Sequence, residues 1–205
     1  MEKLDLIKQF KSLYTPSPKA PVIVDVPAFN ILMIDGHGDP NTSPDYAAAL
    51  SALFTCAYTL KFTIKKISGI DYHVMPMEGL WWAGDMNVFT NTPDKSSWDW
   101  TMMMVQPECV TPELFAAAGA QVAKKVGAEL LSRLRFESYH EGPSVQLMHI
   151  GPFAAEGPNI ARMHAFAKEQ GYVQSGKHHE IYLSDFRRTA PEKLKTVLRQ
   201  PIRKG

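Results

Sequence analysis

One long apolar run constrains the fold of this chain more than any other feature. Residues 46–60 carry no charged side chain. Ser43 and Pro44 stand where a helix N-cap and a first helical residue belong, and Gly69 ends the pattern. One helical stripe is formed by Tyr46, Leu50, Leu53, Ala57, Leu60 and Ile64. Because a membrane span needs about 20 apolar residues, the run predicts a buried core helix and no membrane association.

Short runs of β-branched and aromatic residues on both sides of this helix predict strands. The expected strands are 22–26, 29–34, 72–83, 98–106, 135–139, 144–150 and 179–183. The glycine-rich segment 35–41 is expected to be a loop. Further helices are expected at 4–14, at 111–134, from Pro158 to the stop at Gly171, and around Leu194, Val197 and Leu198.

The order strand–helix–strand–strand therefore occurs twice. It predicts an α+β fold, with an N-terminal helix and proline-rich connector at 1–21 and one domain at 22–205. That domain would consist of two modules, about 22–110 and 111–205, related by pseudo-twofold symmetry. The symmetry is inferred from element order alone, because the halves show no repeat in sequence.

Charge and cysteine content exclude several classes of protein. Lys and Arg number 22 against 21 Asp and Glu, a net charge of +1, so no broad basic field exists for direct nucleic-acid binding. Cys56 and Cys109 stand alone, which indicates reduced thiols. The segment Met1–Tyr14 has no apolar signal-peptide core. We expect a cytoplasmic protein, a monomer or homodimer, with no cofactor or metal.

Tryptophan and methionine are concentrated in one stretch. All four tryptophans fall within 81–100, and six of the ten methionines lie in or beside it: Met75, Met77, Met86, Met102, Met103 and Met104. On a strand, Trp98, Trp100, Met102 and Met104 would share one face, as a packed core or as the wall of a site for a flat polycyclic ligand. Trp81 and Trp82 would point to opposite faces, and Trp82 is favoured for the ligand side.

Glu180 is a carboxylate inside an apolar strand. Glu180 and Tyr182 would share one face, and Ile181 and Leu183 would face a helix-packed core. A desolvated carboxylate suits a general base acting on water or a counter-charge for a cation, whereas a structural ion pair is the alternative. Since neighbouring strand residues alternate, His178, His179 and Glu180 are not expected to converge on a metal ion.

Several motifs together resemble the GyrI-like small-molecule-binding family. They are Val24-Asp25-Val26-Pro27, Gly36-His37-Gly38-Asp39-Pro40-Asn41, Leu53 to Lys61, Met77-Glu78-Gly79-Leu80-Trp81-Trp82, Gln146 to Phe153, and His178-His179-Glu180-Ile181-Tyr182-Leu183-Ser184-Asp185. Phe54 and Phe153 stand where tyrosine is common in the family. The motifs occur in order from residue 24 to residue 185, so the resemblance covers nearly the whole chain.

The resemblance implies tandem modules with a central ligand cleft and two possible activities. Some relatives bind hydrophobic or cationic drugs and place a glutamate on the strand that corresponds to Glu180. Stand-alone relatives with the Gly-Leu-Trp-Trp and His-His-Glu-Ile-Tyr-Leu motifs are similar to cyclopropanoid cyclopropyl hydrolases, which open the strained ring of DNA-alkylating natural products. The expected ligand is a hydrophobic polycyclic or cationic small molecule.

The candidate site follows from these arguments. Glu180 would be the catalytic base, and Tyr139, or alternatively Tyr182, would donate a hydrogen bond to the developing oxyanion. The expected ligand-binding residues are Trp82, Trp98, Trp100, Met102, Met104, Met148, His149 and Tyr182. His149 is the exception, because hydrogen bonding to a backbone carbonyl is the favoured interpretation for it. Detoxifying hydrolase is the first hypothesis, a sequestering or sensing drug binder the second, and a topoisomerase inhibitor the least supported third.

Overall fold

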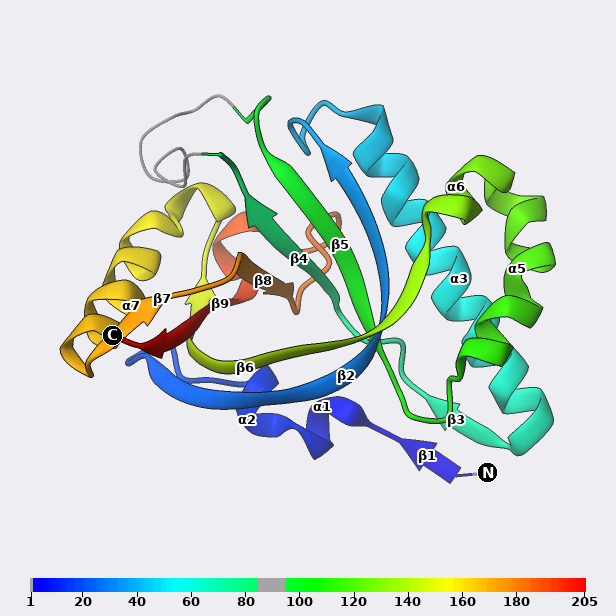
Figure 1. Cartoon of the computed structure of the whole chain (residues 1–205), viewed down its shortest axis with the longest axis horizontal. Coiled ribbons are helices and arrows are strands. Elements are labelled where there is room, and N and C mark those ends of the chain that lie inside the picture. The colour runs from blue at the N-terminus through cyan, green and yellow to red at the C-terminus, as the bar shows by residue number, and fades with distance from the viewer. Residues whose placement is uncertain (1, 85–94) are drawn as a thin grey trace. The chain divides into compact units, whose positions relative to one another are not determined.

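The computed structural model describes residues 2–84 and 95–205, so Met86 lies outside the described part of the chain. Helices and strands alternate, which confirms the predicted α+β class (Figure 1). The chain forms two compact units that are interleaved in sequence. The described residues of Met1–Gln9, Phe29–Met75 and Asp94–Tyr139 form unit 1, and those of Phe10–Ala28, Pro76–Pro93 and His140–Gly205 form unit 2. The two consecutive modules, their symmetry and the cleft stay predictions.

Unit 1 is organised around the predicted core helix. Helix α3 (Pro44–Ser68) begins where Ser43 Oγ accepts a hydrogen bond from the Tyr46 N–H at 3.3 Å, and it ends at Gly69, whose φ is 73°. Its inner residues are fully buried: Ala49, Ala52, Leu53, Cys56, Ala57 and Leu60. The capping residues and the apolar stripe therefore set the helix bounds that the sequence predicts.

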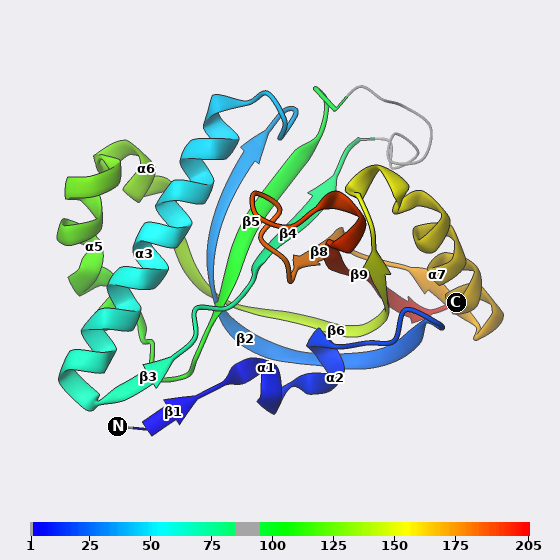
Figure 2. The same cartoon turned by 180° about the vertical axis from the view of Figure 1, so that it is seen from behind.

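Two further helices pack beside α3. The expected helix 111–134 is two helices, α5 (Pro112–Val126) and α6 (Ala128–Arg133), because Gly127 adopts a φ of 89° between them. Seen from behind, α3 lies between α5 and the strands of unit 1 (Figure 2). By length and composition, α3 is also the one helix within 2–84 and 95–205 that could cross a membrane, with 44% of its most apolar window buried. Its packing is that of a core helix.

The N-terminus differs from the expected single helix. Residues Glu2–Leu4 form strand β1, which pairs in parallel with β3 (Ile70–Tyr72), and the helical turns are α1 (Leu6–Gln9) and α2 (Lys11–Tyr14). Leu4 pairs with Tyr72, so the apolar spacing that suggested a helix includes a strand residue.

Strand β2 (Val22–His37) is also longer than expected. Residues 35–37 were expected to be loop, yet Gly36 pairs with Trp100 of the antiparallel strand β5 (Asp99–Gln106). A Cβ on Gly36 would lie 2.0 Å from the Trp100 ring, so this glycine leaves room for an indole rather than for a turn. Trp100 is fully buried and meets the ring of Tyr46 edge-on at 5.1 Å. This is core packing between β5 and α3.

We expect Gly36→Ala to destabilise the protein by about 1–3 kcal/mol, because the methyl group would overlap a rigid, buried indole. The midpoint of urea unfolding measures the change. Gly84→Ala is the matched control, since its Cβ would meet nothing within 4 Å. Equal midpoints for the two variants would contradict the close packing of Trp100 on Gly36.

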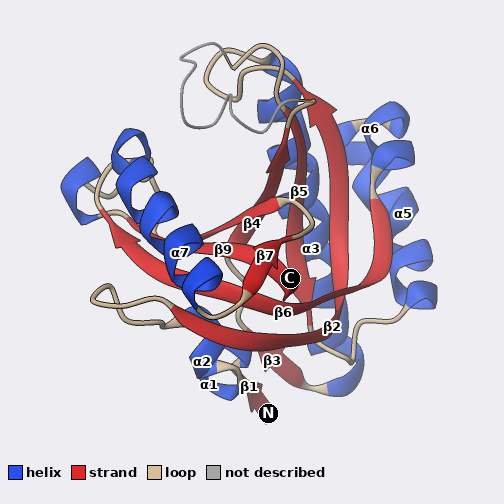
Figure 3. Cartoon of the chain, turned by 60° about the vertical axis from the view of Figure 1, so that its left-hand side comes forward, coloured by secondary structure: helices blue, strands red, loops and turns tan. Residues whose placement is uncertain are grey.

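Unit 2 contains the strand that carries Glu180 and the strands beside it. Strand β8 (His178–Tyr182) lies between β4 (Met77–Trp82) and β9 (Lys195–Lys204), antiparallel to both. Strand β9 also pairs with β6 (Arg135–Ile150) and with β7 (Tyr172–Gln174). Helix α7 (Gly157–Glu169) lies across β6, β7 and β9 (Figure 3).

The expected final helix is wrong, because that segment is strand β9. Only a 3-10 turn at Pro191–Lys193 precedes it, and a similar turn, Phe153–Ala155, follows β6. Val197 and Leu198 are both fully buried, on opposite faces of β9. An apolar run buried on both faces has no alternation, so its sequence pattern could not be told from that of a short buried helix.

Candidate functional site

The pleat of β8 divides its side chains between two faces of unit 2. His178, Glu180 and Tyr182 share one face, and His179 and Ile181 the other. Across the ladder, Glu180 lies opposite Leu198 of β9, which packs in one cluster with Met163 of α7. The helix-packed side is therefore the side of Glu180, so the prediction that Ile181 faces the helix-packed core is wrong.

Glu180 is held by a chain of hydrogen bonds. The Tyr182 hydroxyl donates to Glu180 Oε2 at 2.7 Å, and Trp81 Nε1 donates to the Tyr182 oxygen at 3.0 Å. Because the Tyr182 oxygen accepts a hydrogen bond from the indole of Trp81, the hydroxyl proton of Tyr182 points at the carboxylate of Glu180. The Glu180 side chain is 15% exposed, and His178 Nε2 lies 3.5 Å from its other oxygen, Oε1. Tyr182 thus orients the carboxylate.

Trp81 and not Trp82 lies on the face of Glu180, so ligand contact by Trp82 stays a prediction. Trp81 pairs with His178 in the register of β4 and β8. Trp82 points to the opposite face, where the ammonium of Lys177 lies 3.1 Å from the centre of its ring. The register of β4 against β8 determines which of the two tryptophans shares a face with Glu180, and the sequence does not predict that register.

Two phenylalanines extend the aromatic surroundings of the carboxylate. Phe153 meets the Tyr182 ring edge-on at 5.6 Å, and Phe186 lies 6.4 Å from Phe153. Phe153 is 38% and Phe186 45% exposed, which is high for such large apolar rings. Phe153 belongs to a motif that carries the family resemblance, and this motif could have indicated that Phe153 lies near the site. Nothing in the sequence indicated the same for Phe186.

The other predicted ligand-binding residues lie in different surroundings. Met102 and Met104 are fully buried in β5, and Met148 is 7% exposed on β6. In unit 1 the Lys95 ammonium lies 4.8 Å from the Trp98 ring. Ligand contacts of these residues, and of Trp100, stay predictions.

His149 follows the favoured interpretation. Its Nε2 lies 3.2 Å from the carbonyl oxygen of Pro152, and its Nδ1 lies 2.9 Å from the amide nitrogen of Asn159. An Nε2–H that donates to the carbonyl and an Nδ1 that accepts from the amide would satisfy both ring nitrogens. His149 therefore supports the turn after β6. Tyr139 lies on the part of β6 that belongs to unit 1, and its predicted role as proton donor stays a prediction.

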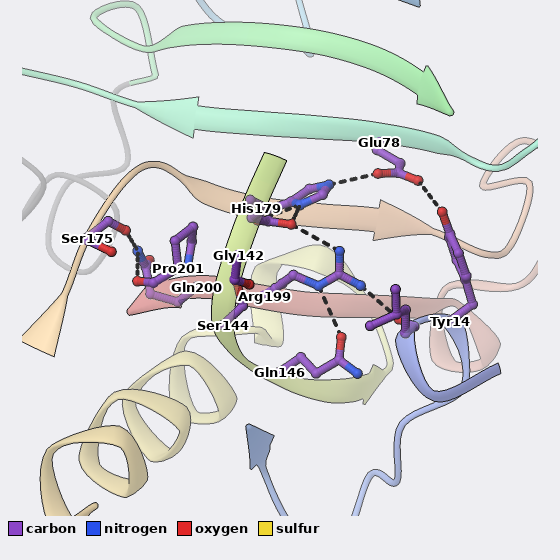
Figure 4. A network of polar contacts seen from close by, with 12 residues as sticks. Tyr14, Glu78, Gly142, Ser144, Gln146, Ser175, His179, Arg199, Gln200 and Pro201 are labelled. Carbon is purple, nitrogen blue, oxygen red and sulfur yellow. Dashed lines mark hydrogen bonds and ion pairs between the residues drawn. The ribbon is translucent and has the colours of Figure 1, made fainter. Parts of the chain in front are cut away.

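A second polar cluster lies on the opposite face of β8 (Figure 4). His179 Nε2 is 3.0 Å from Glu78 Oε2, and His179 Nδ1 is 2.9 Å from Glu141 Oε1. The hydroxyl of Tyr14 donates to Glu78 Oε1 at 3.2 Å. Because both ring nitrogens of His179 face carboxylate oxygens, both carry protons and the ring is an imidazolium.

Arg199 completes this buried cluster. Its Nη1 donates to Glu141 Oε2 at 3.1 Å, its Nε to Gln146 Oε1 at 3.0 Å, and its Nη2 to the Leu13 carbonyl at 2.9 Å. The two carboxylates and two cations balance in charge, and all four side chains are at most 3% exposed. The cluster joins α2, β4, β6, β8 and β9, so it fixes the strand whose other face presents Glu180.

The pKa values in the cluster follow from these contacts. Burial alone would raise the pKa of Glu141, but His179 and Arg199 outweigh it and lower the pKa to about 2. Burial likewise disfavours the imidazolium, yet Glu141 and Glu78 raise the pKa of His179 to about 9. Burial, followed by the charge of Glu78, raises the pKa of Tyr14 well above its ordinary value.

Folding stability should therefore fall on both sides of a window from about pH 4.5 to 6.5. The lowered pKa of Glu141 contributes stability above its unfolded value, which is lost as the pH falls toward 2. The raised pKa of His179 contributes stability below its unfolded value, which is lost as the pH rises toward 9. Urea midpoints between pH 5.5 and about 8.5 should fall less in His179→Gln than in the exposed-residue control His140→Gln. Parallel profiles would contradict this assignment.

Sequence reasoning missed this cluster, although a signal was present. Glu78 and Arg199 each stand in an apolar strand segment, and a charged residue in such a segment needs a buried partner. The partners come from segments far apart in the chain, so spacing could not pair them. The alternation argument does hold for β8, since His178 and His179 point to opposite faces.

The comparisons with known proteins agree with this architecture. The model of the GyrI-like small molecule binding domain matches residues 19–203, so the chain belongs to that family. A search of curated protein sequences finds no significant match.

Solved structures from Listeria innocua cover nearly the whole chain. A conserved protein described as uncharacterized is 37% identical, with a TM-score of 0.88, and covers 98% of this chain and 100% of its own. A protein described as a hydrolase is 36% identical, with a TM-score of 0.84 and the same coverage. The C-terminal domain of EcmrR shares the fold alone, at 10% identity and a TM-score of 0.54, over 90% of this chain and 98% of its own. The chain is thus a small-molecule-binding domain with hydrolases among its similar structures.

Proposed function

We propose that this chain is a detoxifying hydrolase that opens the cyclopropane ring of DNA-alkylating natural products. The observation that carries the proposal is the Glu180 site, a mostly buried carboxylate oriented by Tyr182 and bordered by aromatic rings. The similarity at 36% identity to a Listeria innocua protein described as a hydrolase supports the reaction class. The family resemblance of the motifs around Trp81 and Glu180 suggests the substrate class.

In the proposed reaction, Glu180 removes a proton from water while the water oxygen forms a bond to the strained CH₂ carbon. The ring C–C bond breaks, and its electron pair moves through the conjugated system to a carbonyl oxygen, which becomes a phenolate. A proton from solvent neutralises the phenolate and Glu180 releases its proton to solvent, so substrate plus one water gives product and no oxidant is required. Ring strain supplies much of the driving force. Aromatic side chains that hold a flat substrate would supply the orientation.

Product analysis tests this function directly. The purified protein is incubated with a cyclopropane-bearing alkylator of the duocarmycin class, and the small-molecule fraction is analysed by mass spectrometry. We expect a product that is heavier than the alkylator by one water and that accumulates over many turnovers. Tight binding without product would overturn hydrolysis.

That result would favour the second candidate, a binder that sequesters or senses hydrophobic cations. The half-exposed rings of Phe153 and Phe186 near a carboxylate favour it, because rings and a counter-charge together recognise lipophilic cations. Quenching of tryptophan fluorescence by a flat cationic dye would detect such binding. Loss of quenching in Glu180→Gln with a cationic dye, but not with a neutral one, would identify the carboxylate as counter-charge.

A further inference from the structure

His178 lies beside Glu180, and the described contacts leave both of its buried ring nitrogens without a hydrogen bond. The ring is 5% exposed, and its Nε2 lies 3.5 Å from Glu180 Oε1. Within the described part of the chain neither ring nitrogen makes a hydrogen bond. A buried imidazole without hydrogen bonds costs stability, so a role in the site is a better explanation than a role in packing.

The two oxygens of Glu180 have different neighbours. Oε2 accepts from Tyr182 at 2.7 Å, whereas Oε1 faces His178 Nε2 at 3.5 Å. The Tyr182 hydrogen bond orients the carboxylate, and an imidazolium at Oε1 would stabilise its negative charge. A nearby opposite charge favours the ionised form of a carboxyl group.

A second histidine, His164, lies close enough to His178 to be influenced by its charge, and its surroundings differ. His164 comes from α7 and carries a buried Nε2 without a hydrogen bond in the described residues. Burial, followed by the charge of His178, lowers the pKa of His164 to about 4. Within residues 2–84 and 95–205, the titratable groups shown to act on or with His178 are Glu180 on its own strand and His164 on α7. His178, whose Nε2 lies beside the carboxylate, is the histidine placed to pair with Glu180.

We propose that His178 is a positioning residue for Glu180, holding this carboxylate ionised as the proton acceptor of the hydrolytic step. The electrostatic pairing stands on the geometry of β8, and only its catalytic consequence rests on the proposed function. His178 is adjacent to His179 in sequence, yet it acts on the opposite face from the buried cluster of Glu78, Glu141 and Arg199.

The pairing is tested by measuring the ionisation of Glu180 in the absence of substrate. Protein labelled with carbon-13 at the glutamate carboxyl carbons is titrated by NMR, and the Glu180 signal is assigned by its absence from Glu180→Gln. In His178→Gln, removal of the cation should raise the pKa of Glu180 by about one unit or more. His164→Gln is the matched control, because it removes a nearby histidine that is not paired with Glu180, and it should change the pKa of Glu180 much less than His178→Gln does.

The catalytic consequence has its own readout. If the chain hydrolyses the alkylator, the acid limb of kcat/KM in His178→Gln should move to higher pH by the same amount as the Glu180 titration, with the plateau at high pH and the affinity for ligand retained. An unmoved Glu180 titration in a folded His178→Gln overturns the pairing. His178→Asn gives the same readout if the glutamine variant does not fold. A raised pKa of Glu180 in His178→Gln, together with no product from the parent protein, would support the pairing of His178 with Glu180 and contradict the proposed hydrolase activity.

Discussion

Replacing Glu180 with glutamine is expected to slow hydrolysis of a cyclopropane-bearing alkylator by about 100-fold or more. Glutamine keeps the size of the side chain and can still accept the hydrogen bond from Tyr182, but it cannot take a proton from water. The measurement is the initial rate of product formation at saturating substrate, with binding followed in parallel by tryptophan fluorescence.

A matched control separates chemistry from folding. Glu192→Gln removes an exposed carboxylate from the same unit and should retain the parent rate. Turnover in Glu180→Gln at the parent rate would remove Glu180 from the mechanism. Loss of binding together with rate would instead assign the carboxylate to ligand recognition.

Replacing Arg199 with methionine is expected to destabilise the protein by about 3–5 kcal/mol. The guanidinium donates to Glu141, Gln146 and the Leu13 carbonyl, and it is buried with all three partners. Methionine fills a similar volume but leaves Glu141 with the imidazolium of His179 as its remaining cation. The midpoint of urea unfolding measures the loss.

Arg203→Met is the control for this variant, because Arg203 lies on the same strand but is exposed. It should change stability by less than about 0.5 kcal/mol. Equal unfolding midpoints for the two variants would contradict the structural role of the buried cluster.

Local sequence signals predicted the elements that depend on local chemistry. Helix α3 follows its caps at Ser43 and Gly69, and the alternation along β8 separates His179 from Glu180. The fold class and the family followed from such signals in order along the chain. The signals failed at β9, where burial of Val197 and Leu198 on opposite faces hides the strand period.

The sequence predicts which site residues share a face within one strand, but it does not predict contacts between strands. Glu180 and Tyr182 share a face because of the pleat, which a sequence shows. Their contacts with Trp81 and Phe153 depend on strand register and on the turn after β6, which it does not show. Similarly, Gly36 resembles a turn residue in sequence. The residues next to it in the chain do not indicate that the indole of Trp100 lies against it.

Turnover in water labelled with heavy oxygen shows whether the oxygen that opens the ring comes from water. We expect the ring-opened product to carry one labelled oxygen on the former cyclopropane carbon, and Glu180→Gln to form this product about 100-fold more slowly. Recovery of unchanged alkylator from a tight complex, or a product without the label, would contradict hydrolysis by a water that Glu180 activates.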